Sequence, residues 1–195
     1  MRKTMAALLR WLHVYLSMIS FAVVLFFAAT GITLNHPGWF ENQQKTTMLH
    51  GQVARALLMP AANGSYEPLH LVEQLRQSEH LHGAPADLRI DEAQISFSLR
   101  APGYSADALV DRATGRYDIT VNSFGLVAVL NDLHKGRDSG KAWGWLIDLS
   151  GALLVVVSLS GLGLIWFVYK RRAAGLLLAL LGIVAPCALY LFLLR

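Results

Sequence analysis

The chain has 195 residues, of which 54% are hydrophobic and only 15% are charged, and its net charge is +4. This composition excludes an ordinary soluble domain. A membrane-spanning helix needs about 20 mostly apolar residues. Three segments meet this requirement, residues 11–34, 142–169 and 173–194. A backbone in hydrocarbon must satisfy its own hydrogen bonds, so we expect all three segments to be helices.

The first span, residues 11–34, contains His13 and ends shortly before the helix-breaking Pro37. A cleaved signal peptide is the main alternative for this segment. The apolar run is too long for a signal peptide, and "TLNHPGWF" is a poor cleavage site. We therefore predict that the helix is retained.

Residues 35–141 are predicted to form one small α+β domain. "EPLHLVEQLRQSEHL" has the apolar spacing of an amphipathic helix, and "DLRI" and "QISFSLRA" have the pattern of strands. "DALVDRATGRYDITV" is typical of a hairpin, with Gly115 in its turn. "SFGLVAVLNDLHKG" returns to helical spacing, and we expect Ser123 to cap this helix and Gly136 to end it.

The second span, residues 142–169, and the third, within residues 170–195, are separated by a basic loop. Basic residues also precede the first span, and neither place contains an acidic residue. These basic residues are Arg2, Lys3, Arg10, Lys170, Arg171 and Arg172. Positive loops stay in the cytoplasm, which places the N-terminus (within residues 1–34) inside and residues 35–141 outside. The basic net charge is thus a topology signal, and we predict no nucleic-acid partner.

Several stretches together resemble a known family. "ISFSLRAPGYSADALVDRATGRY" looks like a PepSY domain, and the first span opens with "WLHVYLSM" and ends with "ATGITLNHPGW". "DLHKGRDSGKAWGW" then precedes the second span, which closes with "SLSGLGLIW". These motifs are similar to those of PepSY-associated transmembrane proteins. The resemblance implies a bacterial inner-membrane protein with three transmembrane helices and a periplasmic α+β PepSY-like domain between the first two.

The same resemblance implies a function in iron uptake, since some members of the family look like haem-containing ferric reductases. Longer relatives have four or more helices, so this short form would lack redox sites that they carry. His36 and His134 lie where the chain is expected to leave and re-enter the bilayer. Two imidazoles from neighbouring helices can hold a haem iron axially, and the haem propionates favour basic partners. We predict that His36 and His134 ligate haem b iron, with Lys135, Arg137 and Lys141 beside its propionates. The alternative for each histidine alone is a loop residue without a ligand role.

His13 lies near the opposite end of the first span. It is 23 residues from His36, about 34 Å of helix at ~1.5 Å per residue, so the two cannot bind one iron. We interpret His13 as a further haem ligand or a proton acceptor beside a quinol. A symmetric homodimer would supply a second His13. The alternative is an interfacial histidine that bonds a carbonyl.

The sequence contains no glycine-rich nucleotide motif and no evident catalytic constellation, so NADH has no recognisable site. Electrons would arrive from a quinol or a redox partner protein and pass to ferric iron or a ferric chelate. Whether the chain is itself an enzyme, a ferric reductase, stays open at this point. The competing hypothesis is a non-enzymatic, membrane-anchored module that binds or regulates a periplasmic protein.

Overall fold

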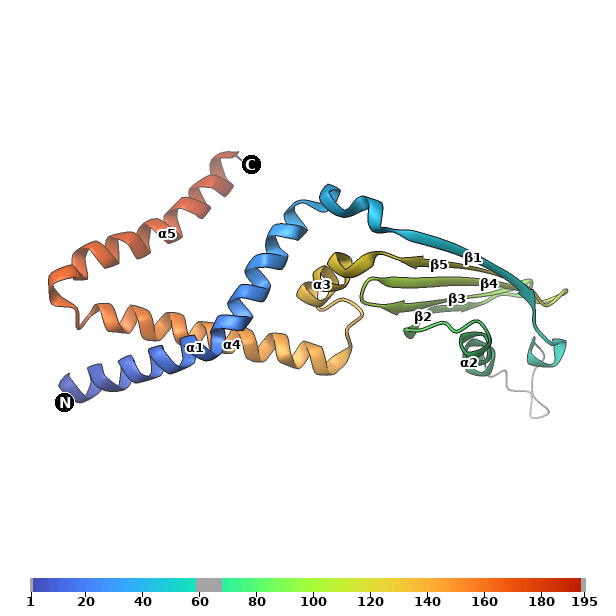
Figure 1. Cartoon of the computed structure of the whole chain (residues 1–195), viewed down its shortest axis with the longest axis horizontal. Helices are drawn as coiled ribbons and strands as arrows, with labels where there is room; N and C mark the ends of the chain where they lie inside the picture. The colour runs from blue at the N-terminus through green and yellow to red at the C-terminus, as the bar shows by residue number, and fades with distance from the viewer. Residues whose placement is uncertain (1, 59–67, 194–195) are drawn as a thin grey trace. The chain divides into compact units, whose positions relative to one another are not determined.

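The computed structural model describes residues 2–58 and 68–193, and the chain divides into two units, which are described separately. The first unit comprises residues 1–25 and 146–195, and the second comprises residues 26–145. Three helices within the described residues are long and apolar enough to cross a membrane, as predicted. They belong to α1 (Arg2–Asn35), α4 (Gly140–Ile165) and α5 (Arg172–Leu193), all labelled in Figure 1.

The second predicted span ends earlier than expected. α4 ends at Ile165, where the backbone hydrogen bonds change to a three-residue spacing: Phe167 N–H donates to the Leu164 carbonyl at 2.9 Å. The 3₁₀ turn η3 (Tyr169–Arg171) then leads directly into α5. The third predicted span agrees with α5, except that Leu194 lies outside the described residues.

The second unit is built on a five-stranded antiparallel sheet with the order β1-β5-β4-β3-β2. The strands are β1 (Lys45–Gln52), β2 (Ala84–Ile90), β3 (Gln94–Ala101), β4 (Tyr104–Asp111) and β5 (Arg116–Ser123). The unit also contains the short elements η1 (Pro37–Gln43), η2 (Arg55–Leu58), α2 (Pro68–Ser78) and α3 (Gly125–Lys135). The end of α1 and the start of α4 belong to it as well. A helix combined with an antiparallel sheet confirms the α+β prediction.

The core of this unit lies between α2 and one face of the sheet. Figure 1 shows α2 beside the strands. Leu71 and Leu75 of α2 are fully buried against alternate strand residues such as Ile95 and Leu99. This alternation follows from the two-residue period of a strand, which sends every second side chain to the same face. The sequence pattern of "QISFSLRA" therefore predicted its buried face correctly.

The predicted hairpin joins β4 to β5, and its turn is held by Asp111. The Asp111 carboxylate accepts hydrogen bonds from the backbone N–H and the hydroxyl of Thr114, each at 2.7 Å. These bonds stabilise the charged carboxylate, so the pKa of Asp111 lies below its ordinary value. Gly115 has φ +73°, which few other residues adopt, and this is why a glycine ends the turn.

Helix α3 begins later than predicted. Ser123 remains in the sheet, where it pairs with Lys45 and Tyr104, so Phe124 takes the N-cap position without a side-chain cap. The predicted stop is confirmed, because Gly136 has φ +68° and its N–H donates to the Leu133 carbonyl.

Candidate functional site: two anchored histidines

His134 lies near the end of α3 and contacts the last turns of α1 through Thr30. The His134 Nδ1 atom lies 2.6 Å from the Thr30 hydroxyl oxygen. That hydroxyl has one hydrogen, which it donates to the Phe26 carbonyl at 2.6 Å. When the hydroxyl keeps this bond, its oxygen accepts a hydrogen from His134, and we therefore assign the imidazole proton to Nδ1. The lone pair of the neutral ring is then on Nε2.

The surroundings of His134 fix its ring further. The edge of Phe27 packs against the imidazole with the ring centroids 4.9 Å apart. One turn along α1, the Thr33 hydroxyl donates to the Asn131 side-chain oxygen at 2.6 Å. A Cβ added at Gly31 would lie 3.8 Å from the His134 ring, an ordinary contact. α1 and α3 are thus joined by two hydroxyl contacts and an aromatic contact.

His13 lies in the first unit, and its ring is held in the same way. Its Nδ1 atom lies 3.1 Å from the Val157 carbonyl and 3.0 Å from the Ser160 hydroxyl of α4. The Ser160 hydroxyl donates its hydrogen to the Val157 carbonyl at 2.7 Å, so both oxygens can accept from His13. The proton of His13 is therefore also on Nδ1, and the lone pair is on Nε2.

The contact between α1 and α4 at His13 depends on the glycine at position 161, which has no side chain. A Cβ added at Gly161 would lie 3.0 Å from Cε1 of His13, tighter than nine in ten real Cβ contacts. Glycine at this position lets the imidazole lie directly against the α4 backbone, as small residues generally do between membrane helices.

The Nε2 atoms of His13 and His134 have no hydrogen-bond partner among the described residues. Ser139 Oγ is the one buried side-chain nitrogen or oxygen without a partner in this part of the chain. Both unpartnered Nε2 atoms therefore reach the molecular surface. We call these two residues the anchored histidines: in each, Nδ1–H is held by a neighbouring helix and a basic nitrogen is left accessible.

His36 is held differently. It lies exposed just after α1, and its ring stacks on Trp39 with the centroids 4.1 Å apart and the planes at 6°. No ring contact recorded within the described residues joins His36 to His134, so the predicted axial pair stays a prediction.

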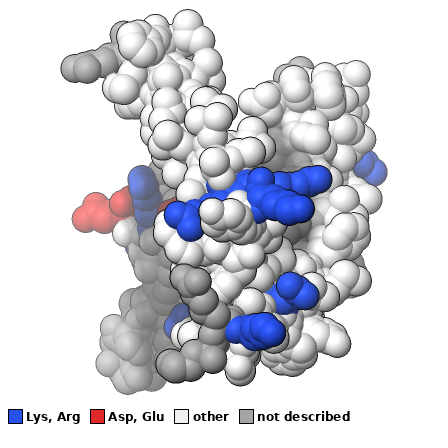
Figure 2. All heavy atoms as spheres, turned by 90° about the vertical axis from the view of Figure 1, so that its left-hand side faces the viewer, with Lys and Arg blue, Asp and Glu red and all other residues white. Residues whose placement is uncertain are grey.

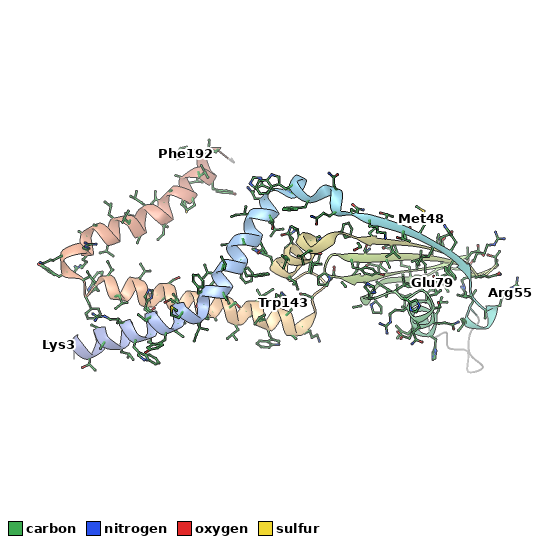
Figure 3. All side chains as sticks on the ribbon, in the orientation of Figure 1. Lys3, Met48, Arg55, Glu79, Trp143 and Phe192 are labelled. Carbon is green, nitrogen blue, oxygen red and sulfur yellow. The ribbon has the colours of Figure 1, made fainter. Side chains whose placement is uncertain are left out.

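The predicted basic partners are Lys135, Arg137 and Lys141, and all three are exposed. Lys135 ends α3, Arg137 lies in the connection, and Lys141 is in the first turn of α4. Arg137 also lines a hollow of about 450 Å³, together with Asp132 and other charged residues at the end of the sheet. The start of α4 is fixed beneath α3, because Trp143, labelled in Figure 3, donates from Nε1 to the Leu133 carbonyl at 2.7 Å.

The remaining histidines show no metal site. His50 pairs with Asp118 at 2.5 Å, and His82 stacks on Tyr104 with the centroids 4.3 Å apart. Within residues 2–58 and 68–193, no group of three or more His, Cys, Asp or Glu side chains could hold a metal ion.

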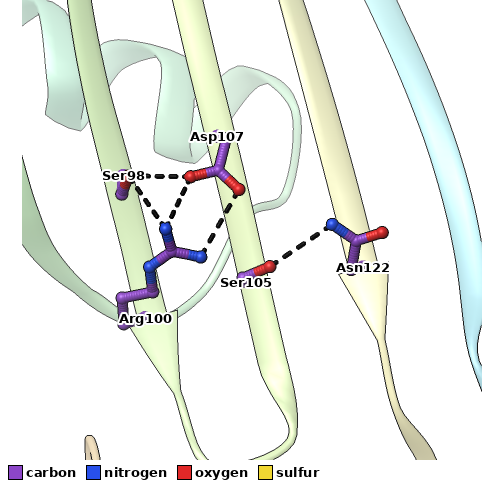
Figure 4. Close-up of polar contacts among 5 residues, drawn as sticks. All are labelled: Ser98, Arg100, Ser105, Asp107 and Asn122. Atoms are coloured by element: carbon purple, nitrogen blue, oxygen red, sulfur yellow. Dashed lines mark hydrogen bonds and ion pairs between the residues drawn. The ribbon is translucent and has the colours of Figure 1, made fainter.

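The sheet face opposite α2 carries paired polar groups. Figure 4 shows the Arg100 guanidinium donating to both carboxylate oxygens of Asp107, at 2.7 and 3.4 Å, and Ser98 donating to the same carboxylate at 2.8 Å. Because these groups satisfy one another, we assign them to the stability of the sheet.

Taken together, three apolar helices and a PepSY-like sheet with one covering helix define a membrane protein with an extramembrane α+β domain. The chain belongs to the PepSY_TM-like family, whose sequence profile matches residues 7–195. This match confirms the resemblance inferred from the motifs. No curated protein and no solved structure matches the chain.

Proposed function

We propose that this protein binds haem b in the bacterial inner membrane and passes electrons from the quinol pool, or from a redox partner protein, to ferric iron. The acceptor would be ferric iron or a ferric chelate at the periplasmic face, and the physiological role would be iron uptake. In this reading the protein is a ferric reductase.

The observation that carries the proposal is the state of the anchored histidines. Histidines that ligate a metal almost always donate their other ring N–H to a protein oxygen, which fixes the ring and raises the basicity of the ligating nitrogen. His13 and His134 both have this arrangement, with Nδ1–H bound and Nε2 accessible. Ionisable residues within membrane helices usually mark functional sites.

The donor set fits haem. Haem would supply one-electron transfer, which needs an exposed edge more than a shaped substrate pocket. His134 would hold one haem together with His36, and His13 would hold another together with the His13 of the other copy of a homodimer. Three exposed cations would pair with the haem propionates: Lys135, Arg137 and Lys141. None of them forms an ion pair within the described residues.

The orientation follows from charge. Basic residues lie in the first part of α1 and in the turn between α4 and α5, and positively charged segments of this kind stay in the cytoplasm. The sheet domain and His134 would then face the periplasm, and His13 would lie near the cytoplasmic side.

An absorption spectrum of the purified full-length protein tests the proposal. We expect a Soret band that weakens in His134→Ala and in His13→Ala. His50→Ala is the matched control, because it removes an exposed imidazole of the sheet domain that is paired with Asp118. Reduction of a ferric chelate by proteoliposomes supplied with quinol should decline in step with the band. Equal bands in all three variants would exclude the anchored histidines as ligands.

The edge of the sheet favours a second candidate function, a docking module for a periplasmic protein. The edge strand β1 pairs regularly with β5 over eight residues and contains no proline. The opposite edge, β2, is interrupted by Pro85 and by a register shift between Ala86 and Arg89, features that prevent an added strand. An extended peptide could thus add to β1. A colourless protein that captures a periplasmic partner, and loses it when Leu49 is replaced by proline, would favour this function.

A further inference from the structure

The turn between α4 and α5 presents three consecutive cations, Lys170, Arg171 and Arg172. Lys170 and Arg171 are exposed, and no carboxylate pairs with any of the three among the described residues. The Arg172 guanidinium lies over the ring of Trp166, 4.4 Å from its centroid. Figure 2 shows lysine and arginine side chains gathered on the side of the molecule that faces the viewer.

α4, the helix that leads to this turn, carries no acidic residue close enough to neutralise the three cations. In residues 1–25 and 146–195 the only acidic residue is Asp148. It precedes the end of α4 at Ile165 by 17 residues, about 26 Å of helix at ~1.5 Å per residue. Charges are screened over about 8 Å at physiological ionic strength, so Asp148 cannot offset the three cations.

The turn is short and well fixed. Arg171 N–H donates to the Val168 carbonyl at 3.1 Å, and Val168 N–H donates to the Ile165 carbonyl at 3.3 Å. A Cβ added at Gly175 would clash with the Ile165 side chain, so α5 packs tightly against the end of α4. The backbone that carries the cations is therefore held before any ligand binds.

Aromatic side chains place this turn at the level of lipid headgroups. Trp166 and Tyr169 are 57% and 88% exposed, although both are large aromatic residues next to an apolar helix. Tryptophan and tyrosine are enriched where a membrane helix meets the headgroup region. Cations beside them would meet the phosphates of the lipid.

We propose that Lys170, Arg171 and Arg172 form a binding site for the phosphate of an anionic phospholipid such as phosphatidylglycerol. Guanidinium groups bind phosphate oxygens with two parallel hydrogen bonds, and Lys170 adds a third positive charge. Each cation near the surface favours an anionic lipid by about fivefold. The site is independent of haem binding.

The test measures which lipids stay with the full-length protein after reconstitution into nanodiscs of equal parts phosphatidylglycerol and phosphatidylcholine. Both leaflets are accessible there, so the direction of insertion does not affect the result. Native mass spectrometry of the released protein should show phosphatidylglycerol enriched several-fold. Lys170→Gln/Arg171→Gln/Arg172→Gln should reduce the enrichment to near parity, and Arg171→Lys/Arg172→Lys should keep most of it.

The matched control is Lys45→Gln/Arg89→Gln/Arg116→Gln, which removes the same charge from the sheet domain and should leave the enrichment unchanged. Equal enrichment in the wild type and the first triple variant would overturn the proposal, as would an equal loss in the control. Displacement of the lipid by a few millimolar inorganic phosphate would assign the cations to free phosphate and overturn the lipid site.

Discussion

Replacing Thr30 by valine should weaken the hold of His134 on its ligand. Valine has nearly the shape of threonine but lacks the hydroxyl that accepts the proton of His134 Nδ1 at 2.6 Å. Thr30 is only 4% exposed, so water cannot readily take the place of the lost acceptor. The imidazole would then be free to rotate or to shift its proton to Nε2, which removes the lone pair from the accessible side.

The size of the effect follows from the burial of this contact. A buried donor left without its acceptor costs about 1–3 kcal/mol, which corresponds to roughly 5- to 150-fold in an equilibrium constant. Loss of such a supporting contact typically weakens metal binding about 10- to 100-fold. We therefore expect haem to leave the valine variant at least tenfold faster than it leaves the wild type.

The assay follows the Soret band while an excess of apo-globin takes up the released haem. Thr30→Ser keeps the hydroxyl and should restore most of the retention. Ser17→Ala is the matched control, because Ser17 bonds only the Val14 carbonyl of its own helix and contacts no histidine. The reasoning is refuted if valine and serine at position 30 release haem at the same rate.

Three further predictions rest on close contacts. Gly161→Ala, whose Cβ would lie 3.0 Å from His13, should shift the haem spectrum, whereas Gly151→Ala, with nothing within 4 Å, should leave it unchanged. Gly103 has φ +65°, and a Cβ added there would lie 2.5 Å from an α3 side chain. Gly103→Ala should therefore lower the thermal unfolding midpoint of the sheet domain, and an unchanged midpoint would contradict this prediction. Burial and the Glu79 carboxylate raise the pKa of Tyr117 to about 12. The folded state keeps this proton to a higher pH than the unfolded chain, so the free energy of unfolding should fall as the pH rises from about 10 to 12. Denaturant unfolding at each pH measures this fall, and Tyr117→Phe should make the free energy of unfolding nearly constant over that range.

The sequence predicts the long elements well, because each is dominated by one physical signal. Hydropathy alone locates the three apolar helices, and the alternation in "QISFSLRA" identifies a strand with one buried face. β1 was not predicted, since "KTTMLHGQ" is an edge strand exposed along most of its length and has no clear apolar alternation. The prediction that Ser123 caps α3 was wrong, because Ser123 pairs with neighbouring strands and so stays in the sheet. This pairing is a tertiary effect.

The candidate site was predicted only in part. His13 and His134 stand out in the sequence because an imidazole in or beside an apolar run is uncommon. Their supporting hydroxyls do not stand out, since Thr30 is 104 residues from His134 and Ser160 is 147 residues from His13. Serine and threonine are ordinary in membrane helices, where they commonly bond the carbonyl one turn earlier. Only the packing of α1 against α3 and α4 reveals that these two hydroxyls also hold the imidazoles.

The central claim is that Nε2 of His13 and Nε2 of His134 hold haem iron, and one measurement tests it most directly. The protein is purified from haem-replete cells beside its His13→Ala/His134→Ala variant, and the haem-to-protein ratio of each is determined. We predict a red wild type with stoichiometric haem and a variant that carries almost none. A colourless wild type, or a double variant with the full haem content, would contradict the account.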